Sequence, residues 1–279
     1  MTDLEPMTNG YYLWHYVPSI AAAVIFAILF FAITVIHFWK LFKSRVRFTI
    51  PFAIGGIFEV IGFAARIAAH NNTAALIPYV IQSIFLLLAP ILFAAAAYMV
   101  LARIICSVSA EDFSPIRIKW ITKVFVTCDI ITFLIQGSGA GMTVESTMSS
   151  MGQYIVLAGL VMQILTFVLF VVTAIVFANR MRLNPTSAVK QGEVPWKKHL
   201  YSLYAISAMI LLRSIFRVIE YACGNGGYLL ATEWPTYVLD ATPMFIAMVC
   251  FAICYPSELQ RFLVRCDSGI ALDPTSLKA

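Results

Sequence analysis

Seven long apolar runs dominate the 279-residue chain and restrict its fold more than any other feature. Each run holds about twenty mainly apolar residues, the length that a helix needs to cross the hydrocarbon core of a bilayer. A backbone in lipid must satisfy its own hydrogen bonds, and the runs lack the alternation of barrel strands, so helices are expected. The predicted spans are residues 17–39, 48–69, 76–103, 120–142, 152–178, 200–222 and 236–255.

The composition agrees with a membrane protein. Hydrophobic residues make up 61% of the chain and charged residues only 12%, whereas soluble domains are about half apolar and about a quarter charged. The sequence therefore predicts an all-α polytopic membrane protein with seven transmembrane helices. Its three parts are an N-terminal tail at 1–16, a seven-helix transmembrane domain at 17–255 and a C-terminal tail at 256–279.

Lysine and arginine gather at one end of the predicted spans. Of the nineteen basic residues, all but Arg66, Arg213 and Arg217 lie in the four segments on that side. The positive-inside rule then places those segments and the C-terminus in the cytoplasm and the N-terminus outside. The net charge of +5 is expected to face anionic lipid headgroups rather than nucleic acid. A glycosylation sequon at Asn71 lies so close to the outer membrane surface that we expect it to be unused.

Charged and amide side chains nevertheless occur inside the spans. A charge at the centre of a membrane helix costs about 2.5 to 3.5 kcal/mol, so these side chains are expected to face one another or water. Helical spacing places Arg213, Arg217 and Glu220 on one stripe, and the others fall in the middle or outer half. The sequence predicts a polar pocket, open to the outside, with nine candidate ligand-binding residues: Glu59, Arg66, Gln82, Asp129, Gln136, Arg213, Arg217, Glu220 and Asp240.

An alternative interpretation is that these residues only form ion pairs that pin the helices together. Buried pairs often contribute little net stability, and intramembrane charges are functional candidates by default. Four acids stand against three arginines within the spans, which leaves one acid unbalanced. That acid is expected to be protonated or to meet a cationic ligand.

Several functions are excluded because their motifs are missing. No GxxxxGK[ST] loop for ATP hydrolysis occurs, and the last span has no lysine for a retinal Schiff base. No GxSxG nucleophile elbow is present, and His15, His37, His70 and His199 fall too far apart along the predicted spans to share one metal. We expect no enzymatic activity, no catalytic residues, no metal and no cofactor.

Proline and glycine mark further features of the spans. Pro90 and Pro243 each remove a backbone donor from a predicted helix and are expected to permit kinks. The segment GSGAG at 137–141 ends the fourth span, and the GxxxG spacing of Gly137 and Gly141 predicts close approach of another helix. Gly159 in the fifth span has the same interpretation.

Four long motifs resemble one known family. They are FEVIGFAAR at 58–66, YVIQSIFLLLAPILFAAAAYMVLARII at 79–105, DIITFLIQGSGAG at 129–141 and RSIFRVIEYACGNGGYLLATEWPTYVLDATPMF at 213–245. These segments resemble the RTA-like family of fungal seven-span proteins, called lipid-translocating exporters. The resemblance covers the spans and singles out the nine candidates together with Glu233.

The resemblance implies a plasma-membrane protein that exports amphiphilic lipids, such as sphingoid long-chain bases or aminosterols, without hydrolysing ATP itself. Carboxylates in the pocket would suit an ammonium headgroup and arginines a phosphate or carboxylate, and the sequence contains both. The alternative is a receptor-like sensor that binds a lipid in the same pocket, since the family shares the topology of seven-helix receptors. Protein partners are not predicted.

Overall fold

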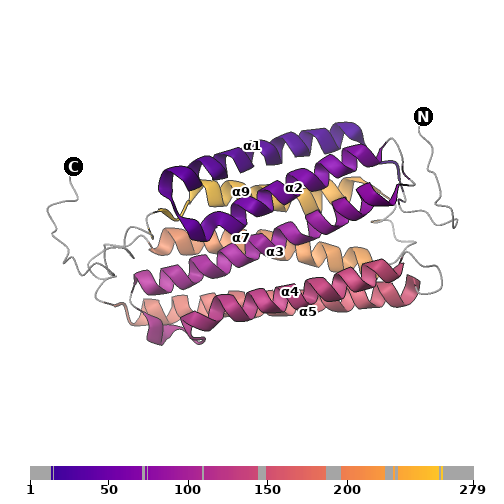
Figure 1. Ribbon diagram of the computed structural model, residues 1–279. Coiled ribbons are helices and arrows are strands. Elements are labelled where there is room, and N and C mark those ends of the chain that lie inside the picture. The colour runs from indigo at the N-terminus through magenta and orange to yellow at the C-terminus, as the bar shows by residue number, and fades with distance from the viewer. Residues whose placement is uncertain are drawn as a thin grey trace.

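Seven long helices run side by side in the computed structural model (Figure 1). The structure describes residues 14, 16–70, 73, 75–108, 110–143, 149–186, 196–223, 229, 232–257 and 259. Six of the seven spans are the α-helices α1 (Ile20–Ser44), α2 (Ile50–Ala69), α3 (Leu76–Ser107), α4 (Ile118–Thr143), α5 (Ser149–Leu183) and α7 (Trp196–Ala222). The last consists of a π-helical segment, η3 (Thr236–Ala241), continued by α9 (Thr242–Ile253). Two short 3-10 turns, η1 (Arg47–Thr49) and η2 (Glu111–Phe113), precede α2 and α4.

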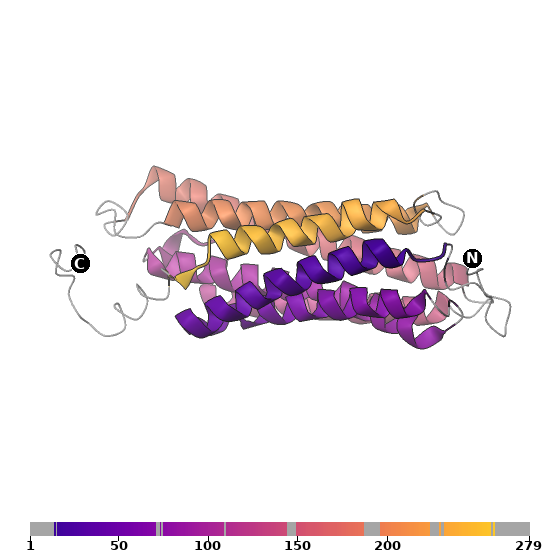
Figure 2. The ribbon, with the colours of Figure 1, turned by 90° about the horizontal axis from the view of Figure 1, so that it is seen from above.

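All seven helices are long and apolar enough to cross a bilayer, with η3 and α9 counted together. This confirms the predicted all-helical class and the seven spans. α3 lies in the middle of the bundle, where it contacts α2, α4 and α7. Its small residues Ala94, Ala95, Ala96 and Ala97 are all buried, and small side chains let neighbouring helices approach closely. Figure 2 shows α9 between α1 and α7, and it contacts both.

The helices at the basic end extend beyond the predicted spans. α1 begins three residues later than expected, after Pro18, and continues to Ser44, five residues beyond the predicted end. The added turn carries lysines that keep their charge at the membrane surface while their stems cover apolar groups. For example, the ammonium of Lys43 lies 5.0 Å from the centre of the Trp39 ring. α5 likewise ends at Leu183 instead of residue 178.

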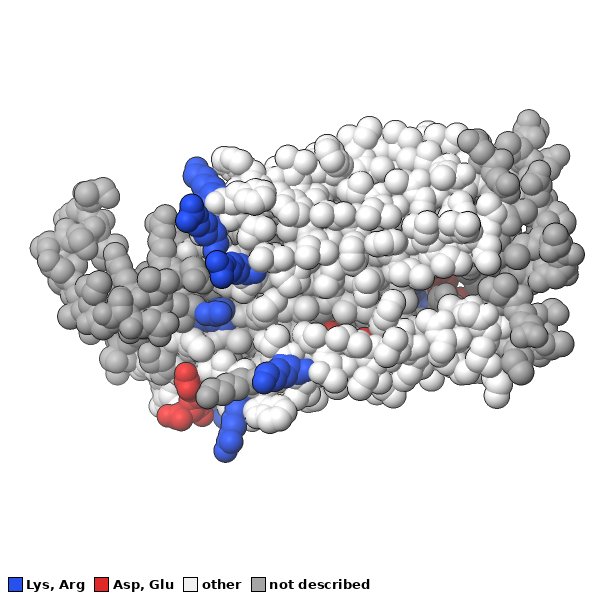
Figure 3. Space-filling model, viewed as in Figure 1, with Lys and Arg blue, Asp and Glu red and all other residues white. Residues whose placement is uncertain are grey.

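On the face shown in Figure 3 the side of the bundle is almost free of charged side chains, and basic residues gather at one end. Phe31, Leu134 and Leu165 are each at least 60% exposed, as expected of side chains that face lipid. The described basic residues other than Arg66, Arg213 and Arg217 lie at the end of the bundle where α1 and α9 finish. They belong to η1, to the segments that connect helices at that end, or to the helix ends there. The distribution is the one from which the orientation was predicted.

The glycines between α4 and α5 correct one prediction. A Cβ atom on Gly137 or on Gly141 would meet no described atom within 4 Å, so neither residue mediates close approach of another described helix. Gly139, between them, does: its Cβ would lie 2.8 Å from the Gly152 carbonyl oxygen and 2.8 Å from the Val156 nitrogen. The helix turns by 100° per residue, so a helix packed on one face of GSGAG meets the central glycine and not the flanking pair. Gly159 packs closely against α4, as predicted.

Candidate functional site

A buried ion-pair network joins α7 to η3. Asp240 binds two arginines of α7: its Oδ1 pairs with Nε of Arg213, and its Oδ2 accepts a hydrogen bond from Nη2 of Arg217 at 2.5 Å. Nη1 of Arg217 donates to Oε2 of Glu220 at 3.1 Å. Arg213, Arg217 and Glu220 stand at i, i+4 and i+7, so one face of α7 carries the whole set. The predicted stripe is therefore present and faces the interior.

A proline in α3 supplies a further partner for Arg213. Pro90 has no N–H, so the carbonyl group of Leu86, four residues earlier, loses its usual donor within the helix. Nη2 of Arg213 donates to that carbonyl oxygen at 2.5 Å. The gap that Pro90 makes in the backbone hydrogen bonds of α3 is thus filled by a side chain from α7.

The π-helical turn positions Asp240. The backbone N–H of Thr242 reaches back five residues to the carbonyl of Tyr237, and the Thr242 hydroxyl donates to the same oxygen at 2.8 Å. Pro243 follows directly and cannot donate to a helical carbonyl, so a regular α-helix cannot continue unchanged through this turn. Single π-turns inside helices often occur at functional sites. Here the turn brings both carboxylate oxygens of Asp240 to α7.

Glu59 of α2 supplies a third carboxyl group near the two arginines. It interacts electrostatically with Arg213, Arg217 and Asp240, and only 2% of it is exposed. Its Oε1 has no hydrogen-bond partner among the described residues. Glu220 and Asp240 already balance the two arginines, and Arg66 pairs with Glu233. Two of the four acids within the spans, Glu59 and Asp129, therefore have no described arginine partner, where the count from the sequence left one. Gln82 of α3 is also buried, and its Oε1 has no described hydrogen-bond partner either.

Arg66 belongs to a separate cluster beside the start of α1. Its Nη2 donates to Oε1 of Glu233 at 2.9 Å and to the Tyr16 hydroxyl at 2.8 Å, and its Nε donates to the Tyr237 hydroxyl at 3.0 Å. The rings of Trp14, Tyr16 and Tyr237 surround the guanidinium, with centres 5.2 to 5.5 Å from Cζ. Such cation–π contacts stabilise a buried arginine by about 1 to 2 kcal/mol.

Glu233 also fixes the start of the first helix. The backbone N–H of Ser19 donates to both of its carboxylate oxygens, at 2.9 and 3.0 Å. A carboxylate at a helix N-terminus satisfies a free N–H and interacts favourably with the helix dipole. His70, just after α2, donates from Nδ1 to the Pro18 carbonyl at 2.7 Å. The segment before α1 is thereby tied to Arg66 and His70, on the same end of the bundle.

Two predicted site residues are bound elsewhere. Oδ2 of Asp129 in α4 accepts a hydrogen bond from the Tyr98 hydroxyl of α3 at 2.8 Å. Nε2 of Gln136 donates to Oε1 of Gln163 in α5 at 2.9 Å. Neither makes a described contact with the arginines of α7. The nine candidates are all largely buried, and their described contacts place them in separate groups instead of one continuous cluster.

Part of the site lay outside the predicted set. Glu233 was identified only through the family motif, because it precedes the last span and so was not counted among the intramembrane charges. The sequence also did not single out the residues that contact the candidates, because tyrosines and amides are common in membrane helices. These residues are Tyr98, Gln163, Tyr237 and the aromatic residues around Arg66. No spacing signal distinguishes them from other tyrosines and amides. The Asn71 sequon lies outside the described residues.

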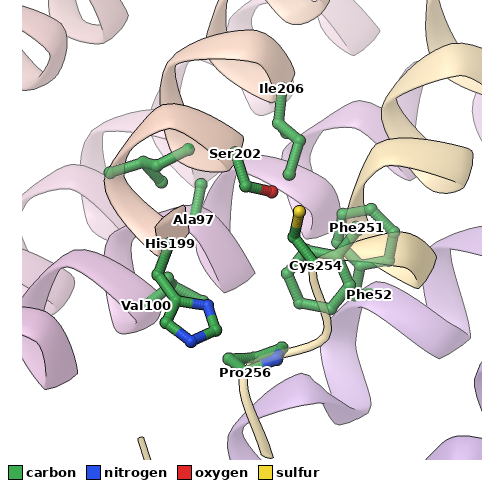
Figure 4. Close-up of a pocket in the computed structure, with 10 residues that line it drawn as sticks. Phe52, Ala97, Val100, His199, Ser202, Ile206, Phe251, Cys254 and Pro256 are labelled. Atoms are coloured by element: carbon green, nitrogen blue, oxygen red, sulfur yellow. The ribbon is translucent and has the colours of Figure 1, made fainter. Parts of the chain in front are cut away.

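A small cavity lies at the opposite, basic end of the bundle (Figure 4). Side chains from α2, α3, α7 and α9 enclose it, among them Phe52, Val100, Ser202 and Phe251. Its volume of about 10 Å³ is at most enough for one water molecule. This cavity is therefore too small to hold an amphiphile.

Seven apolar helices around a buried charge network define an integral, multi-pass membrane protein with a polar site in its interior. The sequence profile of the family described as RTA1 like protein matches residues 52–262. The match covers more than half of the chain, and the chain belongs to this family. This confirms the resemblance drawn from the four motifs.

Curated relatives cover most of the chain. It is 33% identical over 274 residues to Protein RTA1 of Saccharomyces cerevisiae, which covers 89% of this chain and 86% of that protein. It is 30% identical over 283 residues to Protoporphyrin uptake protein 1 of the same yeast, with 88% and 92% covered. Sphingoid long-chain base transporter RSB1 of Saccharomyces cerevisiae (strain YJM789) is 26% identical over 296 residues, with 92% and 76% covered. No solved structure matches the chain.

Proposed function

We propose that this protein translocates amphiphilic lipids with a cationic headgroup across the fungal plasma membrane. Sphingoid long-chain bases and aminosterols have this chemistry, and a relative is named as a sphingoid long-chain base transporter. In the proposed orientation the basic end of the bundle is cytoplasmic, and the charge network lies in the outer half of the membrane. The protein hydrolyses no ATP itself, so the movement is driven by a gradient or by a partner.

Glu59 carries this proposal. Two arginines and two carboxylates of the network neutralise one another, whereas Glu59 adds a third carboxyl group with a free, buried oxygen. An unpaired carboxylate in an apolar interior is unfavourable, and a cation that binds there relieves the penalty. An ammonium headgroup can form charge-assisted hydrogen bonds to Glu59 while its apolar chain stays among the helices or in lipid.

The cluster around Arg66 is proposed to close the outer side. Its contacts join α2 to the segment before α1 and to the residues before η3. In this proposal a ligand that enters from outside displaces the contact of Arg66 with Tyr16, because Arg66 lies nearer than Glu59 to the outer end of α2. Glu59 and Arg66 are seven residues apart, which is about 10 Å along the helix.

Flux through liposomes tests the proposal. Purified protein in liposomes should move a fluorescent sphingoid base between leaflets faster than empty liposomes do. Glu59→Gln should reduce that flux by at least about tenfold, because a neutral amide gives up the charge-assisted contact. Glu111→Gln is the matched control, since it makes the same substitution at an exposed carboxylate of η2 and should leave the flux unchanged.

Three results would count against the proposal. Flux equal to that of empty liposomes, under a range of ion gradients, would exclude autonomous translocation. Saturable binding of the base without any flux would instead support the receptor-like sensor. Equal fluxes of wild type and Glu59→Gln would remove Glu59 from the transport site.

A further inference from the structure

An open groove runs between α5 and α7 in the half of the bundle nearest the basic end. It has a volume of about 370 Å³, within the usual range of ligand sites. Two stripes of side chains line it: Val171, Ile175, Ala178, Asn179 and Arg182 on α5, and Tyr204, Ser207, Ala208 and Leu211 on α7. Both sets recur at helical spacing, so each helix presents one continuous face to the groove.

Side-chain size explains why the groove exists. Ala178 and Ala208 leave room between the two helices. The hydroxyl of Tyr204 donates to the Ala174 carbonyl at 3.2 Å and so places a large ring between the backbones. From Val171 to Arg182 the groove extends over twelve residues of α5, which rise by about 16 Å along the helix, close to the thickness of one hydrocarbon leaflet.

The groove is apolar along its length and polar at one end. Asn179 and Arg182 stand at the basic end, and Val171 and Leu211 stand towards the middle of the bundle. Among the described residues the Arg182 guanidinium donates one long hydrogen bond, 3.5 Å to the Tyr201 hydroxyl, and no described carboxylate lies within 4 Å of it. Neighbouring side chains such as Val172 and Leu212 are 43 to 46% exposed, so the groove opens on the lipid-facing surface.

We propose that this groove is a binding site for an anionic phospholipid of the leaflet at the basic end. The acyl chain lies between α5 and α7, and the phosphate accepts hydrogen bonds from the guanidinium of Arg182 and the amide of Asn179. An arginine at the rim matches a phosphate in charge and in geometry. The lipid is distinct from the transported amphiphile, because the site lies on the outside of the bundle and has the opposite charge from Glu59.

Retention of lipid by the purified protein tests the site. The full chain is incubated with equal amounts of phosphatidic acid and phosphatidylcholine of identical chains, and the bound lipid is measured by native mass spectrometry. Wild type should retain phosphatidic acid in preference. Arg182→Ala should weaken that retention about tenfold, whereas Arg180→Ala, which removes an equal charge two residues away and outside the groove lining, should not.

A second pair of variants tests the chain-binding part. Ala208→Trp fills the groove and should abolish retention of phosphatidic acid, whereas Val172→Trp adds the same bulk to the exposed surface beside it and should have no effect. Circular dichroism confirms that the variants keep their helical content. Because neither pair touches the charge network, sphingoid-base flux can fail while this site is upheld.

Three outcomes would overturn the inference. Equal loss of phosphatidic acid in Arg182→Ala and Arg180→Ala would show that the lipid is held only by the overall positive charge of the basic end. Complete displacement of phosphatidic acid by glycerol 3-phosphate would show that the site binds a free phosphate group and not a lipid. Cross-linking of Ala208→Cys to a second copy of the chain, in lipid nanodiscs, would show that another protomer fills the groove.

Discussion

Neutralising Asp240 is the most direct test of the charge network. The substitution Asp240→Asn removes the charge that joins Arg213 to Arg217, both of which it contacts. Each arginine keeps one partner, since Arg213 still donates to the Leu86 carbonyl and Arg217 still donates to Glu220. Breaking a buried pair by removing one partner costs about 3 to 5 kcal/mol, and the remaining partners favour the lower end, about 3 kcal/mol.

Thermal unfolding in detergent measures this loss. For a chain of this size about 3 kcal/mol corresponds to a fall in Tm of about 6 to 12 °C. Glu220→Gln removes a single contact to Arg217, whose side chain is 19% exposed, so after solvent screening its effect should be about 1 kcal/mol or a few degrees. Glu59→Gln removes no hydrogen bond or ion pair between described residues and should leave Tm unchanged or raise it.

The order of the falls in Tm among the three variants shows which carboxyl groups stabilise the charge network. Equal shifts for Asp240→Asn and Glu220→Gln would show that Asp240 does not bridge the two arginines. The largest fall in Glu59→Gln would show that Glu59 is a structural member of the network, which would also remove the basis of the proposed transport site. Loss of flux in Glu59→Gln at full stability is the combination that a ligand-binding carboxylate requires.

Two further predictions concern helix packing. Gly139→Leu should destabilise the protein by about 1 to 3 kcal/mol, because the leucine side chain would meet the backbone of α5. Gly137→Ala should be neutral or stabilising by up to about 1 kcal/mol. Equal changes in Tm for the two variants would contradict the assignment of the helix contact to Gly139. Pro90→Ala returns an N–H to the Leu86 carbonyl and competes with Arg213, so its effect on Tm should differ between the wild-type and Arg213→Lys backgrounds. Additive shifts in that double-mutant cycle would show that the two residues are independent.

The spans could be predicted from the sequence because hydrophobic length is a local property. Every predicted span contains a helix, and the errors lie at the ends, such as the extension of α1 to Ser44 and of α5 to Leu183. Those turns contain lysine or arginine, which hydropathy counts as non-membrane although they form helix well. A hydropathy criterion locates the edge of the hydrocarbon and not the end of the helix.

The grouping of the buried charges could be predicted only in part. Periodicity identifies the face of a helix, and it correctly placed Arg213, Arg217 and Glu220 together. It does not identify which helix packs on that face, so Asp129 and Gln136 were assigned to one common pocket although they bind Tyr98 and Gln163. Spacing also did not identify which glycine of α4 packs against another helix. Gly137 and Gly141 have the GxxxG spacing, but it is Gly139 that lies against α5.

The contacts of Arg213 connect the predicted prolines to the predicted charges. Its two partners lie where two spans lack a regular α-helical hydrogen bond: the Leu86 carbonyl that Pro90 leaves without a donor, and Asp240 in the π-helical turn before Pro243. A helix is easiest to bend where a backbone hydrogen bond is already missing. A cation that draws Asp240 away from the arginines would therefore act on α3 and on the last span where a regular backbone hydrogen bond is missing. Arg213 thus links the buried charges to the proline sites of α3 and of the last span, which are separate features in the sequence.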